Sequence, residues 1–467
     1  MSTISASKNI EKGSKRKWIY AKKPGGQFFN YRQWFGYFLL AFLFIAPFIK
    51  IGNEPFLMFN IIERKFVIFG NVFWPQDLHI FVFGMLIAMV CIVLFTVVYG
   101  RIWCGWACPQ TIFMELVFRR IEYWIEGDWL KQKKADSQPS STAVRLRKIA
   151  KHSIFILISF FISNIFLSYI IGVDALWKII TDPVSQHLAG LISIVVFTLV
   201  FYFVFAYVRE IVCIAICPYG RLQGVLMDDQ TITIAYDYKR GEPRGHRKKG
   251  VEDQEIGDCV DCELCVHVCP TGIDIRKGTQ MECVNCTACI DACDAVMDKL
   301  DRPQRLIGFY SAEELEEGVG RKKKKNTRAI AYTVVLTVLM GIFAYLIFSR
   351  AEVDGTLLRA KGSTYQLRDD GTVTNLYSLE LINKTSQDLD FILVPRESNM
   401  TIQLVNQIDH IAAGSAVQMS LFLISPQDQV KDYKNNIKID VVSEGKVVET
   451  LKTTFISPPA HGQAWGK

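Results

Sequence analysis

The chain has 467 residues, half of them hydrophobic, and a formal net charge of +7. This length exceeds one ordinary domain, and the apolar residues gather in long runs, which is typical of membrane proteins. Lys and Arg residues crowd beside those runs, where they fix topology and meet anionic lipid head groups. The positive charge therefore requires no nucleic-acid partner.

Five segments are apolar over the roughly 20 residues that a helix needs to cross a bilayer. They are residues 34–51, 79–99, 153–173, 188–208 and 329–348. The sequence therefore predicts a multi-domain membrane protein with five transmembrane α-helices. A basic stretch from Lys8 to Arg32 precedes the first segment and no small-residue cleavage site follows it, so we expect this segment to stay as an anchor.

The distribution of Lys and Arg between the segments predicts their orientation. Connections 101–151 and 209–328 are rich in these residues, whereas connection 173–187 has only Lys178. The positive-inside rule then places the N-terminus and both basic connections in the cytoplasm and the C-terminal region outside. The 13 cysteines all precede Phe348, which agrees with thiols kept on the reducing side of the membrane.

Apolar and charged residues alternate at helical spacing in residues 111–136, with Phe113 and Trp124 on one face and Glu115 and Glu122 on the other. This pattern predicts an amphipathic helix. Because it directly follows a membrane segment, we expect it to lie on the inner membrane surface.

A cysteine motif occurs twice, each time at the inner end of an apolar segment. The motif is Cys-x3-Cys-Pro, at Cys104 and Cys108 and again at Cys213 and Cys217. Cysteines four apart in a helix share one face, so each motif can present two thiols. The four thiols could bind Cu(I), relay electrons through a dithiol–disulfide couple or hold a further iron–sulfur cluster. Buried packing is the simpler alternative.

A weaker repeat lies at the opposite ends of the same two segments, where Pro-x3-His precedes each at His79 and His187. Two imidazoles there could ligate a metal, a haem or a quinone head group. The competing interpretation is that they only anchor helices at the membrane interface.

Two further cysteine runs have the spacing Cys-x2-Cys-x2-Cys-x3-Cys of bacterial two-cluster ferredoxins, in which the last cysteine of each run ligates the other run's cluster. The first predicted 4Fe-4S cluster therefore has the ligands Cys259, Cys262, Cys265 and Cys293, and the second has Cys283, Cys286, Cys289 and Cys269. Structural zinc sites usually use separated pairs instead. The second run ends in Cys293-Asp294, where the usual ferredoxin run has Cys-Pro.

Beyond Phe348 the pattern becomes alternating, which predicts short strands. The strand candidates are residues 378–381, 391–394, 419–421, 437–441 and 446–448. We expect a small antiparallel β-sandwich that binds or braces other proteins, with the lone His410 in a structural role.

These features divide the chain into five predicted parts. They are a basic cytoplasmic N-terminus (1–33), a four-helix membrane domain of two repeats (34–228), a cytoplasmic two-cluster ferredoxin-like insert (229–328), a fifth transmembrane helix (329–348) and an external β-domain (349–467).

The combination resembles the cytochrome c oxidase accessory protein family known as CcoG, FixG or RdxA. The resemblance rests on residues 101–110, 213–220 and 236–245 and on the paired cysteine runs, and it extends over nearly the whole chain from about Tyr31. It implies a bacterial inner-membrane protein with a periplasmic immunoglobulin-like domain at its C-terminus.

The resemblance also implies an activity: reduction of Cu(II) to Cu(I) during maturation of the cbb-type oxidase. The expected partners are membrane lipid, a cytoplasmic electron donor, copper-handling assembly factors and oxidase subunits. Copper would meet the chain at Cys104, Cys108, Cys213 and Cys217. Two other functions stay open, a quinol-linked electron conduit that uses His79 and His187 and a non-catalytic assembly scaffold. Whether the chain forms a homo-oligomer also stays open.

Overall fold

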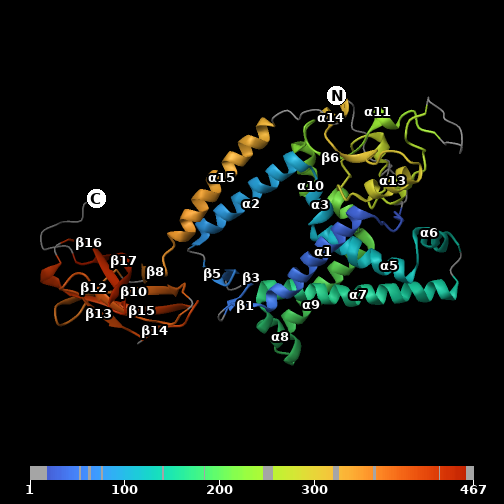
Figure 1. Ribbon diagram of the computed structural model, residues 1–467. Helices are drawn as coiled ribbons and strands as arrows, with labels where there is room; N and C mark the ends of the chain where they lie inside the picture. Colours follow the sequence, from blue (N-terminus) through green and yellow to red (C-terminus); the bar gives the residue numbers. More distant parts are fainter. Residues whose placement is uncertain are drawn as a thin grey trace, which may run out of the picture. The chain divides into compact units, whose positions relative to one another are not determined.

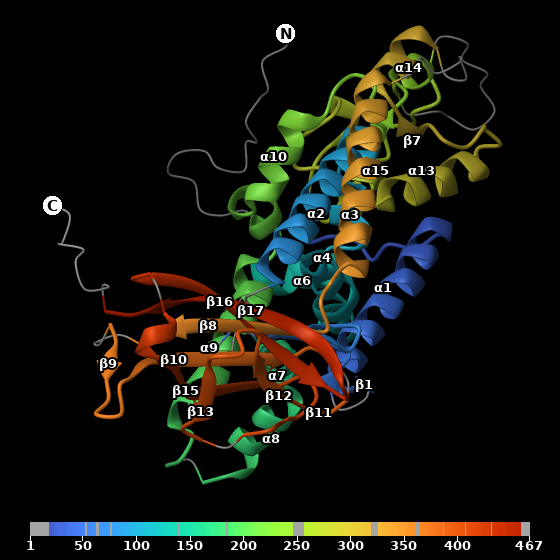
Figure 2. The ribbon, with the colours of Figure 1, turned by 90° about the vertical axis from the view of Figure 1, so that its left-hand side faces the viewer.

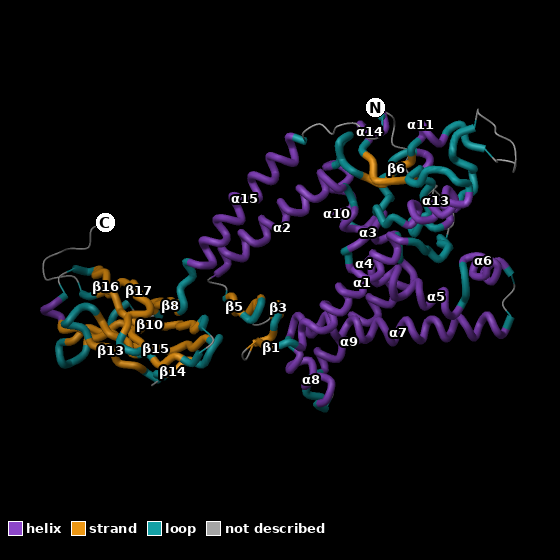
Figure 3. The backbone as a smooth tube through the Cα atoms, viewed as in Figure 1, coloured by secondary structure: helices purple, strands orange, loops and turns teal. Residues whose placement is uncertain are grey.

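The computed structural model describes residues 18–51, 54–61, 65–74, 77–138, 141–183, 185–245, 256–318, 326–360, 364–385, 387–406, 408–430 and 432–458. The basic residues Lys8 to Lys17 and Arg321 to Lys325, and Pro75 of the first Pro-x3-His motif, lie outside these ranges. The chain forms two compact units. The helical unit comprises Met1–Ile45, Phe83–Ser168 and Asp174–Gly341, and the β-rich unit comprises Ala46–Val82, Tyr169–Val173 and Ile342–Lys467. Figure 3 shows the helices in purple and the strands in orange.

Within the described residues, four helices are long and apolar enough to cross a membrane (Figure 1). They are α2 (Leu78–Tyr99), α7 (Thr142–Ile171), α9 (Leu188–Phe203) with its π-helical extension to Val208, and α15 (Thr327–Phe348). No residue in the apolar stretch of α15 is buried. An apolar helix with no buried residue is typical of a helix that faces lipid.

The first expected span differs from the prediction. Helix α1 covers Gln27–Ile45 and is followed by a 3₁₀ turn, Ala46–Phe48, so it ends before residue 51. Pro47 cannot donate a helical hydrogen bond, which agrees with this early end. With its polar N-terminal turns, α1 is not among the four apolar helices found in the described residues. A fifth crossing by α1 stays a prediction.

The predicted surface helix is also different. Residues 109–137 form four consecutive pieces, α4 (Pro109–Ile112), a π-helix (Phe113–Phe118), α5 (Arg119–Ile125) and α6 (Trp129–Ser137). Phe113 and Phe118 pack in one core with Phe155 and Phe205. The charged face is buried as well, because its carboxylates and guanidinium groups pair with one another inside the helical unit. The first part of this segment, as far as Glu122, is therefore mostly core, whereas Trp124 is 80% exposed and most of α6 is not buried.

The remaining helices of this unit are short, and all of them except α8 lie in the part of the chain that carries or directly follows the cysteine motifs. They are α3 (Ile102–Trp106), α8 (Val173–Thr181), a π-helix (Val212–Ile216), α10 (Pro218–Leu226), α11 (Tyr238–Gly241), α12 (Leu264–His267), a 3₁₀ turn (Ile275–Lys277), α13 (Ala288–Lys299) and α14 (Ala312–Glu317). Strands β6 (Thr233–Tyr236) and β7 (Ile307–Tyr310) pair antiparallel. This pair joins the two ends of the segment that carries both ferredoxin-like cysteine runs.

The β-rich unit begins with short strands that the sequence analysis did not predict. They are β1 (Lys50–Ile51), β2 (Glu54–Pro55), β3 (Leu57–Asn60), β4 (Lys65–Ile68) and β5 (Asn71–Phe73). Strands β3, β4 and β5 form an antiparallel meander with Met58, Val67 and Val72 as its core.

The rest of the β-rich unit consists of antiparallel strands in two main sheets (Figure 2). The strands are β8 (Val353–Arg359), β9 (Gln366–Leu367), β10 (Thr372–Asn383), β11 (Leu389–Asp390), β12 (Ile392–Pro395), β13 (Thr401–Leu404), β14 (His410–Ile411), β15 (Ala416–Pro426), β16 (Lys434–Ser443) and β17 (Lys446–Ile456). One sheet has the order β13-β15-β10-β8, with β9 beside β10, and the other has the order β12-β16-β17. Tyr377, Leu421, Ile439 and Phe455 share the buried core. Each predicted strand segment overlaps one of these strands.

Candidate iron–sulfur and thiol site

The first cavity in the helical unit gathers four cysteines from the two ferredoxin-like runs. Cys259, Cys262, Cys265 and Cys293 line it. Its remaining walls are largely aliphatic, with Val296 and Leu306 among them. Four thiols in apolar surroundings are the donor set of a 4Fe-4S cluster, so the residues present fit the predicted first cluster.

The second cavity gathers the complementary set. Cys269, Cys283, Cys286 and Cys289 line it, and Cys265 touches it as well. In both cavities three cysteines come from one run and the fourth from the other, which is the crossed arrangement that the spacing predicts. We call them cavity 1 and cavity 2.

The two runs share a backbone conformation around their middle cysteines. Asp261 and Glu263 flank Cys262 with φ of 56° and 55°, and Asn285 and Thr287 occupy the same places in the second run with φ of 52° and 67°. Residues other than glycine rarely adopt this left-handed region, and such conformations concentrate at binding sites. The repeated strain indicates that each loop is shaped around its cavity.

Burial affects the protonation of these thiols. It raises the pKa of Cys286 to about 11 and that of Cys283 to about 12. Without a metal these cysteines therefore stay protonated at neutral pH, and metal binding must displace their protons.

The helices that begin inside the two cysteine runs, α12 and α13, differ in length because of one residue. After the first run, Cys269-Pro270 follows the four-residue helix α12. After the second, Asp294 replaces proline and α13 continues to Lys299. The Asp294 carboxylate accepts hydrogen bonds from the backbone N–H of Arg305 at 2.7 Å and from its guanidinium at 2.8 Å. The departure from the ferredoxin pattern thus extends a helix and fixes the segment beside it.

The duplicated Cys-x3-Cys-Pro motifs lie close to these cavities. Cys104 is in α3 and Cys213 is in the π-helix, while Cys108 and Cys217 are the N-cap residues of α4 and α10. The proline after each N-cap cysteine occupies the first helical turn, which suits its missing N–H. We refer to these four residues as the helix-end thiols.

Two of the helix-end thiols share an apolar core with cavity 2. Cys104 and Cys213 pack in one cluster of side chains with Cys286 and Cys289. A methyl group at Gly105 would lie 2.4 Å from the carbonyl oxygen of Val284. Only glycine permits this approach of α3 to the loop that lines cavity 2.

Burial raises the pKa of three of the helix-end thiols, Cys104, Cys108 and Cys213. Cys104 is buried, and its Sγ donates to Oε1 of Gln223 at 3.1 Å. Burial raises the pKa of Cys213 to about 12, and the neighbouring Cys108 and Cys104 add to the effect. Among the described residues, no group of three or more His, Cys, Asp and Glu side chains is arranged to hold a single metal ion. Copper binding by these thiols stays a prediction.

A shared site of the two histidines of the Pro-x3-His repeats stays a prediction. His79 lies exposed in the first turn of α2, and His187 precedes α9 with its Nε2 3.1 Å from Oδ2 of Asp182. The two residues belong to different compact units.

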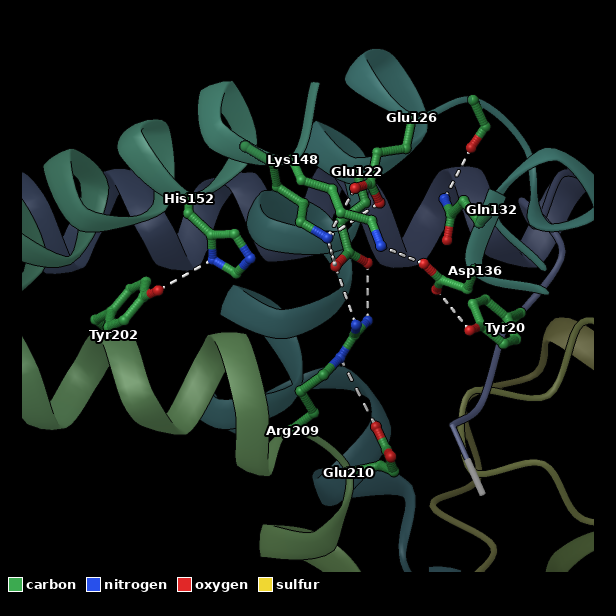
Figure 4. A network of polar contacts seen from close by, with 12 residues as sticks. Tyr20, Glu122, Glu126, Gln132, Asp136, Lys148, His152, Tyr202, Arg209 and Glu210 are labelled. Atoms are coloured by element: carbon green, nitrogen blue, oxygen red, sulfur yellow. Dashed lines mark hydrogen bonds and ion pairs between the residues drawn. The ribbon is translucent and has the colours of Figure 1, made fainter. Parts of the chain in front are cut away.

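Sequence reasoning missed a buried charge network beside the helix-end thiols (Figure 4). Arg209 lies four residues before Cys213 and pairs with Glu122 through both carboxylate oxygens, at 3.0 and 2.9 Å. Lys151 contacts Glu126 at 2.9 Å, and Arg119 contacts Glu115 at 2.6 Å. The sequence signal that could have indicated this network is the pair of adjacent charges, Arg209 and Glu210, at the end of an apolar run.

Three family models match successive parts of the chain. A "4Fe-4S binding domain" matches residues 81–134, a "4Fe-4S dicluster domain" matches residues 208–312, and the "IG-like fold at C-terminal of FixG" matches residues 343–458. Together with the four apolar helices, these matches define an iron–sulfur oxidoreductase with a C-terminal immunoglobulin-like domain.

Relatives extend along most of the chain. Protein RdxB of Cereibacter sphaeroides is 33% identical over 406 residues, 84% of each chain, and protein RdxA of the same organism is 33% identical over 88% of this chain and 89% of its own. The nitrogen fixation protein FixG of Rhizobium meliloti is 30% identical over 79% of this chain and 77% of its own. The chain belongs to the FixG/RdxA/RdxB family.

One solved structure is also similar. The crystal structure of a FixG-related protein from Vibrio parahaemolyticus covers 23% of this chain and 97% of its own, with 18% identity and a TM-score of 0.21.

Proposed function

We propose that this chain is a membrane-bound iron–sulfur reductase that converts Cu(II) to Cu(I) for assembly of a cbb-type cytochrome c oxidase. The supporting observation is the shared apolar core of Cys104, Cys213, Cys286 and Cys289. Thiols that can meet a soft metal lie beside a cavity whose cysteines suit an iron–sulfur cluster.

The exposure of the cysteines supports a direction for electron flow. Cys262 in cavity 1 is exposed, whereas Cys286 in cavity 2 is buried against the helix-end thiols. A soluble one-electron donor can approach cavity 1 most closely. We infer that electrons enter there and leave from the side of cavity 2.

The redox balance of the proposed reaction is simple. Each Cu(II) ion, as substrate, takes one electron and becomes Cu(I), and a soluble reductant supplies that electron. When bound, a 4Fe-4S cluster provides one-electron chemistry at low potential. The helix-end thiols favour the product because Cu(I) prefers thiolate ligands more strongly than Cu(II) does.

We also propose where the two parts of the protein lie and which proteins receive the copper. The cavities and the helix-end thiols would face the cytoplasm of a bacterium, and the immunoglobulin-like domain would lie in the periplasm. Copper-handling assembly factors would receive Cu(I) and pass it to oxidase subunits.

Anaerobically purified full-length protein tests this function. After reduction with dithionite and removal of excess reductant, Cu(II) is added and Cu(I) is followed with a coloured chelator. We expect Cys104→Ser combined with Cys213→Ser to slow Cu(I) formation at least about ten-fold, because removing two thiolates removes the preferred Cu(I) ligands. The EPR signals of the reduced iron–sulfur clusters should persist.

Cys91→Ser is the matched control, because Cys91 lies exposed in α2 outside every motif. It should reduce Cu(II) at the wild-type rate. Wild-type reduction after replacement of all four helix-end thiols would contradict the copper assignment, and loss of copper reduction in Cys91→Ser would show a nonspecific effect.

A further inference from the structure

A third cavity in the helical unit lies between α6 and the beginning of α7, and neither the iron–sulfur chemistry nor the helix-end thiols use it. Its volume is about 240 Å³ and it is open to solvent. Six of the residues that line it are charged: Lys131, Lys134, Arg147, Lys148, Glu126 and Asp136.

Both carboxylates of this cavity are already engaged. Asp136 contacts Nζ of Lys148 at 2.5 Å and accepts a hydrogen bond from Tyr20 at 2.6 Å (Figure 4). Glu126 accepts a hydrogen bond from Lys151 at 3.0 Å.

The other cations have no such partner. Lys131, Lys134 and Arg147 form no ion pair with any carboxylate in the described part of the chain. The cavity therefore presents three uncompensated positive charges, and it can accept an anion without displacing an existing contact.

The position of the cavity along α7 indicates which anion reaches it. The apolar part of α7 begins near Ser153, and the preceding turns carry Arg145, Arg147, Lys148 and Lys151. At the helical rise, Arg147 lies about 9 Å from Ser153 along the axis. If α7 spans the bilayer as its length and hydropathy allow, that distance places the cavity at the depth of the lipid head groups.

We propose that this cavity binds a phosphate group, and that an anionic phospholipid of the surrounding leaflet supplies it. The Arg147 guanidinium suits two phosphate oxygens at once, and the lysines add compact positive charge. Basic pockets beside transmembrane helices are suited to anionic lipid head groups. The bound lipid would hold α6 against α7, next to the Glu126–Lys151 contact that leads to Glu122 and Arg209.

Native mass spectrometry of the full chain tests this site. Protein is released from nanodiscs that contain equal amounts of phosphatidylglycerol and phosphatidylcholine, and retained lipids are counted. We expect the wild type to retain phosphatidylglycerol preferentially. Lys134→Gln with Arg147→Gln should lower that retention about ten-fold, because each cation near anionic lipid contributes substantially to binding.

The matched control is Lys133→Gln with Arg145→Gln, which removes the same charge from the same two helices outside the cavity. It should retain phosphatidylglycerol as the wild type does. Lys134→Arg with Arg147→Lys should also retain it, which separates loss of charge from loss of folding. Equal losses in the cavity and control variants, or no preference over phosphatidylcholine, would overturn the site.

Two further arms distinguish the source of the anion. Inorganic phosphate at millimolar concentration should leave the lipid bound, because a lipid also has its acyl chains in the bilayer. Complete displacement would assign the cavity to a soluble phosphate instead. Displacement by an acidic peptide, with no effect of phosphate, would assign it to a protein partner and overturn the lipid proposal.

Discussion

Arg209 and Glu122 form a bidentate ion pair whose side chains are only 3% and 5% exposed. Arg209 has φ of 55° and ψ of −123°, and Gly100, at the matching place before Cys104, has φ of 57°. The second repeat thus keeps an arginine in a conformation that favours glycine. The ion pair explains why arginine occupies this position, because a glycine has no side-chain charge that could neutralise Glu122 in the core.

We expect Glu122→Gln to destabilise the protein by about 3–5 kcal/mol, because the buried Arg209 loses its bidentate carboxylate partner and keeps only the longer contact with Glu210, at 3.9 Å. Thermal unfolding of the purified protein measures the effect. Arg328→Gln is the control, since its pair with Asp228 is 46% and 27% exposed and exposed pairs contribute little. A fall in melting temperature of the same size in both variants would show that burial of the pair is unimportant.

Gly105→Ala should separate α3 from cavity 2. The added methyl group would lie 2.4 Å from the carbonyl oxygen of Val284 and 2.9 Å from Cα of Cys286, and neither backbone atom can rotate away. We expect a loss of about 1–3 kcal/mol, the usual cost of overpacking, and an altered EPR spectrum of the iron–sulfur protein.

Gly341→Ala is the control for this substitution, because nothing lies within 4 Å of the position of its added methyl group. It should leave both stability and the EPR spectrum unchanged. If Gly105→Ala behaves in the same way, the close approach of α3 does not shape cavity 2.

Each cavity gathers the four cysteines that the sequence analysis grouped together, because local spacing determines most of each group. Six of the eight cysteines lie within two segments of seven residues each, and the crossed pairing follows from the same pattern. The sequence did not predict that Cys104 packs with Cys286, because 181 intervening residues separate them. Only the fold brings such distant residues together.

The segment 111–136, which the sequence analysis expected on the inner membrane surface, differs from its prediction for another reason. Glu115, Arg119 and Glu122 recur at helical spacing, and a charged face is normally solvated. Here the charges neutralise one another inside the helical unit, so both faces are buried in the first part of the segment, as far as Glu122. Periodicity shows that a helix has two faces but not that a second set of charges, such as Arg209, covers one of them. Strands of two to four residues, such as β1 to β5, are also too short for alternation to be detected.

Asp77 should make the β-rich unit sensitive to acid. Its carboxylate is 3% exposed and contacts Lys384 at 2.6 Å and Arg350 at 2.7 Å. Burial opposes ionisation, but the contacts with Lys384 and Arg350 outweigh it and hold the pKa of Asp77 below 3.8. A lowered pKa means that the stabilisation is present above pH 3.8 and is lost as the pH falls through the folded-state pKa.

We therefore expect Asp77→Asn to lower the melting temperature at pH 7 and to reduce its dependence on pH below about 5. Asp354→Asn is the control, because Asp354 also contacts Lys384, at 3.2 Å, but is 34% exposed. It should keep the acid sensitivity of the wild type. An unchanged pH profile in Asp77→Asn would exclude this carboxylate as its source.

Asp294→Pro would restore the ferredoxin-like Cys-Pro ending to the second run, and we expect it to be harmful. Proline at this position removes the N–H inside α13 and clashes with the carbonyl of Ile290, at a cost of about 3 kcal/mol. Ile290 is fully buried, and Cys293 lines cavity 1. The bend should therefore displace Cys293 and lower the iron and sulfide content of the purified protein.

Asp294→Asn separates the helix from the charge. It keeps α13 intact and loses only the ion pair with Arg305, whose side chain is 41% exposed, so we expect nearly full iron and sulfide content.

The same two variants also test whether α13 holds the N-terminus of α1. Asp291 in α13 accepts hydrogen bonds from the backbone N–H groups of Phe28 and Phe29 at 3.1 and 2.7 Å. Hydrogen exchange at the start of α1 should rise in Asp294→Pro and stay slow in Asp294→Asn. Equal exchange in the two variants would mean that α13 does not hold the end of α1.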